Sequence, residues 1–257
     1  MSLNEISILL GLVFIAICAN LLSAFSGGGA GLVQLPALIL LGLPFPKALA
    51  THKLASIALG IGATFRHAQE KKIKPSLALF ILGWGLPGVL LGSNLIIFFP
   101  SKTSTLFLGL LTLWLGLISS KISLEERKNQ KRNFSGLRKL IGGFVLFLIG
   151  ILNGSLSSGT GLFVTMWLVT WFGFSYSTSI AYTLVLVGIF WNGAGALVLG
   201  LNGDVYWSWL PALIVGSLIG GYLGAHLSLI NEEKLIKKAF ELISVSLGIS
   251  LLIKASL

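Results

Sequence analysis

Apolar segments follow one another along almost the whole chain, with only short polar stretches between them. Ten such segments can be distinguished, at roughly residues 5–26, 31–43, 47–65, 76–99, 104–119, 139–156, 161–173, 177–199, 208–228 and 236–255. Because a helix rises about 1.5 Å per residue and the hydrocarbon core of a bilayer is about 30 Å thick, most of them can cross a membrane. Charged residues make up only 10% of the chain, far less than in a soluble domain. The sequence therefore predicts an all-α polytopic protein of the cell membrane.

The basic residues are concentrated in three of the polar stretches. The net charge is +10, and 14 of the 18 Lys and Arg residues lie within 66–75, 120–139 and 231–238. Short loops rich in Lys and Arg are typical of the cytoplasmic side of a membrane. Placing these three loops inside puts both termini outside. The same placement makes the lipid bilayer, and not nucleic acid, the expected partner of the positive charge.

A glycine-rich interruption occurs twice, at equivalent places in the two halves of the chain. The first apolar segment runs into Ser26-Gly-Gly-Gly-Ala-Gly31, and the sixth runs into Asn153-Gly-Ser-Leu-Ser-Ser-Gly-Thr-Gly161. Irregular backbone inside a membrane is tolerated where it lines a cavity, and a matched pair of interruptions indicates a transporter binding site. The segments that follow, 31–43 and 161–173, are too short to span comfortably. We expect each to form a bent or re-entrant hairpin with the segment before it.

Each half contains five segments, and an odd number predicts two repeats of inverted orientation. The loops agree with this, because 66–75 is rich in Lys whereas the corresponding 200–207 contains no Lys or Arg. Gly-x-x-x-Gly motifs begin at Gly88 and Gly220 in the fourth segment of each half, and this spacing lets helix backbones approach closely. The predicted units are a first repeat at 1–120, a basic cytoplasmic linker at 121–138 and a second repeat at 139–257.

Few ionisable residues lie within the apolar segments. His52 and Lys53 stand side by side near the start of the third segment, and an ionisable residue inside a membrane indicates a functional site. The alternatives are snorkelling of Lys53 to the interface and simple packing of His52. The matching positions of the second half hold Tyr182, Thr183 and Leu184. No carboxylate lies in the middle of a segment, so an anionic substrate is favoured over an acidic ion-coupling site.

The two interruptions supply the remaining candidates for substrate binding. Helices that start near Gly31 and Gly161 would direct unpaired N–H groups and positive dipole ends towards the middle of the membrane, which suits a small oxyanion. Inversion of the two halves would make these ends converge. The predicted substrate-binding residues are Lys53, His52, Ser26, Gly27, Gly28, Gly29, Asn153, Ser157, Ser158, Gly159 and Thr160. The alternative is that the glycines and serines only permit tight helix packing. No metal site or cofactor is predicted.

With these residues in view, the chain resembles the TauE/SafE sulfite exporter family of probable membrane transporter proteins. The resemblance is carried by four stretches, which begin at Ser26, Ala48, Asn153 and Gly216. It implies transport of sulfite, a sulfonate or a related sulfur compound. Where the family often has Gly-Pro in the second interruption and a polar or basic residue further on, this chain has Ser158-Gly-Thr160 and Tyr182-Thr-Leu184.

A membrane transporter of a small anion is therefore the leading hypothesis. An anion channel shares most of these features. An intramembrane serine enzyme would use Ser155, Ser157 or Ser158 with His226, but the Gly-x-Ser-x-Gly motif is missing from the sequence and we predict no enzyme activity. The single Cys18 excludes an intramolecular disulfide. The sequence leaves a homo-oligomer open.

Overall fold

All regular elements of the described chain are helical. The computed structural model describes residues 3–27, 29–67, 73–119, 136–202, 205–228 and 233–256. The helices are α1 (Leu3–Ser26), α2 (Ala30–Leu40), α3 (Phe45–His67), α4 (Pro75–Ile96), α5 (Ser101–Ser119), α6 (Gly136–Ser155), α7 (Thr160–Thr170), α8 (Tyr176–Val185), the π-helix η1 (Leu186–Trp191), α9 (Asn192–Leu201), α10 (Leu210–Leu227) and α11 (Glu233–Ser256). The predicted all-α class is confirmed, and the ten predicted segments correspond to these helices. The linker residues 121–135 lie outside the described part, and α6 begins at Gly136.

Seven helices of the described chain are long and apolar enough to cross a membrane. They cover Glu5–Phe25, Phe45–Arg66, Pro75–Ile96, Ser101–Ile118, Gly136–Ser155, Tyr176–Leu201 and Leu210–Leu227. In contrast, α2 and α7 have 11 residues each. At about 1.5 Å per residue such a helix extends about 16 Å, which is roughly half of the hydrocarbon core. Neither short helix can therefore span on its own.

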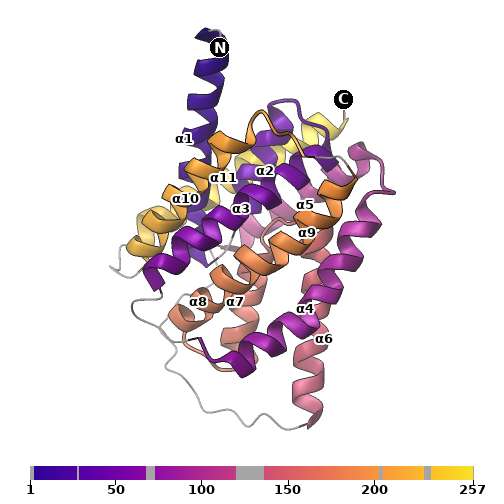
Figure 1. The fold of residues 1–257 in the computed structure, drawn as a ribbon, viewed down its shortest axis with the longest axis vertical. Coiled ribbons are helices and arrows are strands. Elements are labelled where there is room, and N and C mark those ends of the chain that lie inside the picture. The colour runs from indigo at the N-terminus through magenta and orange to yellow at the C-terminus, as the bar shows by residue number, and fades with distance from the viewer. Residues whose placement is uncertain are drawn as a thin grey trace.

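Helices that are far apart in the sequence pack side by side. The closest pairs are α1 with α10, α4 with α6, α3 with α10, and α5 with α11. Figure 1 shows the orange helix α10 lying beside the indigo helix α1 and the purple helix α3. The two halves are thus intertwined, and the interior between them contains residues of both.

Glycines make two of these helix pairs possible. A Cβ atom on Gly88 or Gly92 of α4 would collide with the backbone of α6, at Phe147 and Ile151 respectively. A Cβ atom on Gly220 of α10 would lie 2.5 Å from the carbonyl O of Ile17 in α1. The close approach that the two Gly-x-x-x-Gly motifs predict is therefore confirmed.

The ends of the described chain lie on the same side of the molecule. The start of α1 and the end of α11 both point to the upper part of Figure 1. This agrees with the parity of the segments, which places both termini on one side of the membrane. Which side of the membrane this is stays a prediction.

Candidate functional site

Both glycine-rich interruptions contain backbone in the left-handed region. Gly27 (φ +80°), which follows the last residue of α1, and Gly159 (φ +66°), which precedes α7, adopt this conformation at little steric cost. Ser157 also has a positive φ of +60°, which is uncommon for a residue with a side chain. At each interruption the chain therefore leaves a long helix and starts a short one within a few residues, as the sequence predicts.

The two interruptions touch each other. A Cβ atom on Gly31, in the first turn of α2, would lie 2.7 Å from the carbonyl O of Ser157 and 3.0 Å from Cα of Ser158. From the second half, the Thr165 hydroxyl donates a 2.6 Å hydrogen bond to the carbonyl O of Gly27. Segments more than 120 residues apart in the sequence therefore meet in the interior.

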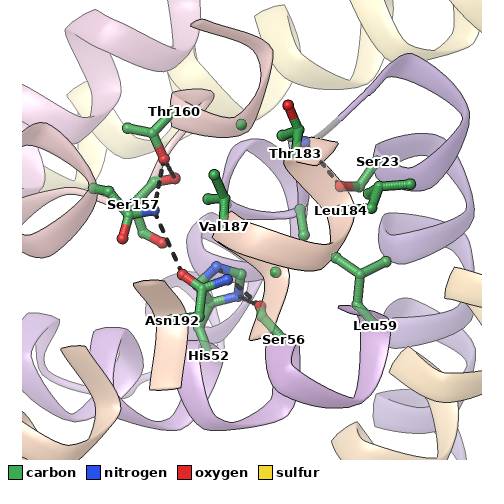
Figure 2. A pocket seen from close by; sticks show the side chains of 16 residues that line it. Ser23, His52, Ser56, Leu59, Ser157, Thr160, Thr183, Leu184, Val187 and Asn192 are labelled. Carbon is green, nitrogen blue, oxygen red and sulfur yellow. Dashed lines mark hydrogen bonds between the residues drawn. The ribbon is translucent and has the colours of Figure 1, made fainter. Parts of the chain in front are cut away.

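A cavity lies where the two interruptions meet (Figure 2). The lining residues are Ser23, Gly29, Ala30, Gly31, His52, Ser56, Leu59, Asn153, Ser157, Thr160, Gly161, Thr183, Leu184, Val187, Gly188 and Asn192. The first residues of both α2 and α7 are among them, so both short helices begin at the cavity wall. None of these lining residues is acidic. The cavity therefore combines two helix N-termini with neutral hydrogen-bonding side chains.

The polar side chains on one wall form a connected network. Asn153 Nδ2 donates to Thr160 Oγ1 at 2.9 Å and lies 3.5 Å from Asn192 Oδ1. Thr160 Oγ1 in turn donates to the carbonyl O of Ser157 at 3.0 Å. Figure 2 shows Thr160, Ser157 and Asn192 grouped on the same side of the cavity. Helix α6, the second interruption and α9 thus jointly position this wall.

Lys53 lies behind this wall and does not line the cavity. Its Nζ donates to the carbonyl O of Asn153 at 2.7 Å and to Asn153 Oδ1 at 3.1 Å. The side chain is completely buried, so Lys53 does not snorkel to the interface. Because the ammonium group of a charged lysine can only donate, it fixes Oδ1 of Asn153 towards itself and leaves Nδ2 for the cavity side. Lys53 therefore influences the cavity indirectly, by orienting the side chain of Asn153.

His52 also lines the cavity and is buried. Its Nδ1 lies 3.1 Å from Oε1 of Gln34 in α2. Ser56, one turn further along α3, places its hydroxyl 3.4 Å from either ring nitrogen. His52 and Ser56 are visible together in Figure 2.

The other predicted site residues divide into three groups. Gly29, Asn153, Ser157 and Thr160 line the cavity together with His52. Gly27, Ser158 and Gly159 are not among the lining residues, and Ser158 Oγ lies 3.0 Å from the Thr112 hydroxyl. The predictions for Gly28 and for the Ser26 side chain concern positions outside the part that the structure describes.

Sequence reasoning missed four polar residues of the lining, namely Ser23, Ser56, Thr183 and Asn192. Each is a single polar residue in an apolar helix, which is too common a pattern to stand out. Two signals were nevertheless present. Ser56 lies four residues after His52 and therefore on the same helix face. Thr183 occupies the position in the second half that matches His52.

The structure does not assemble the serine and histidine of the enzyme alternative. Ser155 Oγ donates to the carbonyl O of Ile151, and His226 accepts a hydrogen bond from Arg66 at 3.1 Å. The Ser56–His52 contact lies in the cavity, but no carboxylate lines that cavity to orient the histidine. Within the described residues no three His, Cys, Asp or Glu side chains come together to hold a metal ion.

Comparisons with known proteins agree on the class of protein. The family described as "Sulfite exporter TauE/SafE" matches residues 12–251. The "Probable membrane transporter protein YfcA" of Escherichia coli K12 is 28% identical over 95% of this chain and 90% of its own length. A "Probable membrane transporter protein" of Haemophilus influenzae is 29% identical over 89% of each chain, and YdhB of Bacillus subtilis is 25% identical over 90% of this chain and 95% of its own.

No solved structure matches the chain. The family match covers more than nine-tenths of the sequence, and the relatives are named as transporters and not as enzymes. The chain belongs to the sulfite exporter TauE/SafE family, and it is a multi-pass membrane transporter.

Proposed function

We propose that the protein carries a small sulfur oxyanion, such as sulfite or a sulfonate, across the cytoplasmic membrane through the cavity between the two glycine-rich interruptions. The observation that carries the proposal is that the first turns of α2 and α7 line one cavity. Exposed N–H groups at helix N-termini and the positive ends of helix dipoles favour an anion. The family description, which names sulfite, supports a sulfur oxyanion.

Individual residues would divide the work of anion binding. Asn153 would donate to the anion the Nδ2 hydrogen whose contact with Asn192 is long, at 3.5 Å, while its other Nδ2 hydrogen stays on Thr160. Lys53 would hold Asn153 in its donor orientation and add positive potential at short range. No Asp or Glu is among the lining residues, so no carboxylate charge in the cavity wall repels the anion.

We further propose that residues 1–120 and 139–257 are inverted repeats joined by the basic linker 121–138. Reciprocal packing supports this, because the fourth helix of each half packs on the first helix of the other, α4 on α6 and α10 on α1. Matching positions also line the same cavity, since His52 corresponds to Thr183 and Gly31 to Gly161. Alternating access would then arise from one repeat moving against the other around the cavity.

The test is flux of sulfite, sulfate and taurine into proteoliposomes that contain the purified protein. We expect saturable sulfite or sulfonate flux down an imposed concentration gradient, faster than in protein-free liposomes. Saturation distinguishes the transporter from a channel, whose flux would rise linearly with concentration. If none of the three substances moves faster than in protein-free liposomes, the proposed substrate class is wrong.

A further inference from the structure

Of the residues that line the cavity, His52 alone has an ionisable side chain. The residues that surround it from other helices are neutral: Asn20 on α1, Gln34 on α2, Asn153 on α6, Thr183 on α8, Asn192 on α9 and Ser217 on α10. Lys53 is the next residue on α3, but its amine is directed to Asn153. Any proton that binds in the cavity wall must therefore bind to His52.

A chain of hydrogen bonds determines which nitrogen of His52 is free. The carbonyl O of Ala16 can only accept, and it lies 2.7 Å from Nδ2 of Asn20. That same Nδ2 donates to the Ser217 hydroxyl at 2.9 Å and lies 3.4 Å from Oε1 of Gln34, whose Nε2 also donates to the Ser217 hydroxyl. Turning the Gln34 amide over would bring two NH₂ groups together. The oxygen of Gln34 therefore faces Asn20 and His52.

This orientation sets the tautomer of the neutral ring. Since Oε1 of Gln34 only accepts hydrogen bonds, Nδ1 of His52 must carry a hydrogen and donate it across 3.1 Å. The lone pair is then on Nε2. The Ser56 hydroxyl, 3.4 Å from Nε2, can rotate to donate to the neutral ring or to accept from the protonated one.

We propose that Nε2 of His52 binds a proton that crosses the membrane together with the anion. This inference rests on the proposed function and adds a coupling ion to it. A proton leaves hydronium in the entering water, whose O–H electron pair stays on oxygen, and forms an N–H bond at Nε2. The imidazolium then donates to the bound oxyanion, and it returns the proton to water on the exit side.

Electrostatics link the two binding events. A protonated His52 beside Lys53 places two positive charges in a region of low dielectric constant, which is unfavourable without a counter-ion. An oxyanion in the cavity supplies the opposite charge. The proton and the anion therefore bind more tightly together than separately, as coupled transport requires.

The test measures proton and anion movement together in proteoliposomes, with a trapped pH-sensitive dye and with two substrates, sulfite and methanesulfonate. Methanesulfonate carries no proton of its own near neutral pH, whereas sulfite can enter as the hydrogen sulfite ion. We expect about one proton per anion with either substrate in the unmodified protein. His52→Gln should lower this ratio several-fold while a slower, potential-driven anion flux persists. His226→Gln, at the histidine that pairs with Arg66 outside the cavity, should leave the ratio unchanged.

A second variant covers the case in which His52→Gln does not fold. Gln34→Glu puts a carboxylate against Nδ1–H and should move the fall of coupled flux with rising pH upwards by about 1 to 3 pH units. An unchanged pH profile, or an unchanged proton-to-anion ratio in His52→Gln, overturns the inference. Anion flux without protons overturns it while leaving the proposed function standing. Absence of any anion flux overturns both.

Discussion

At the scale of single residues, the Lys53–Asn153 contact is the most informative feature of the site. A fully buried amine loses its hydration, and here it recovers two acceptors from one asparagine. Such an arrangement is poor for stability, because an apolar side chain of the same length would avoid the cost of desolvation. A residue that costs stability and directs a donor into a cavity is better explained by function.

Lys53→Met is therefore expected to impair transport more than folding. Asn153 would lose the partner that fixes Oδ1, and the anion would lose nearby positive potential. We expect KM for the transported anion to rise about 10- to 100-fold, the equivalent of one charge-assisted hydrogen bond of about 1.5–3 kcal/mol. Melting temperature in detergent should stay the same or increase. Lys102→Met, at an exposed position of α5, is the control and should change neither quantity. Unaltered flux in Lys53→Met would remove Lys53 from the site.

At the scale of helices, two glycines of α4 make a matched pair for testing the α4–α6 contact. Gly88→Ala should destabilise the protein by about 1–3 kcal/mol, because its Cβ would collide with the backbone at Phe147. At Gly83 no atom lies within 4 Å of an added Cβ. Gly83→Ala should therefore stabilise α4 by up to about 1 kcal/mol through helix propensity alone. Thermal unfolding in detergent measures both, and equal effects would contradict the packing described for α4.

The helices also show where prediction from sequence succeeds and where it stops. Glycine runs are local and conspicuous, so the interruptions and the short helices α2 and α7 were predictable from sequence. The π-helix Leu186–Trp191 was not, because its Gly188 meets Gly60 of α3 only in the folded chain. The Asn20–Gln34–Ser217 network was equally hidden. Its members lie on three helices, and only the fold brings them together.

At the scale of the whole molecule, the proposed repeats are alike in backbone and unlike in chemistry. An interruption and a helix from each half line the cavity, but only the first half contributes ionisable residues, namely His52 in the lining and Lys53 next to Asn153. Thr183 occupies the matching position in the second half, and its side chain is not ionisable. Both proposed repeats would thus form the anion site, whereas the positive charge at that site would come from the first repeat alone.

Inverted repeats make a definite prediction about sidedness. Lys74, before α4, and Asn202, after α9, follow the third segment of their respective halves, so they should lie on opposite sides of the membrane. In a Cys18→Ser background, Asn202→Cys should react with a membrane-impermeant thiol reagent in intact cells, whereas Lys74→Cys should react only after permeabilisation. Ser101→Cys, at the start of α5, should behave like Asn202→Cys. Labelling of Lys74→Cys and Asn202→Cys from the same side would show that the halves run parallel. The two short helices would then enter the membrane from one face, and their shared cavity would need another explanation.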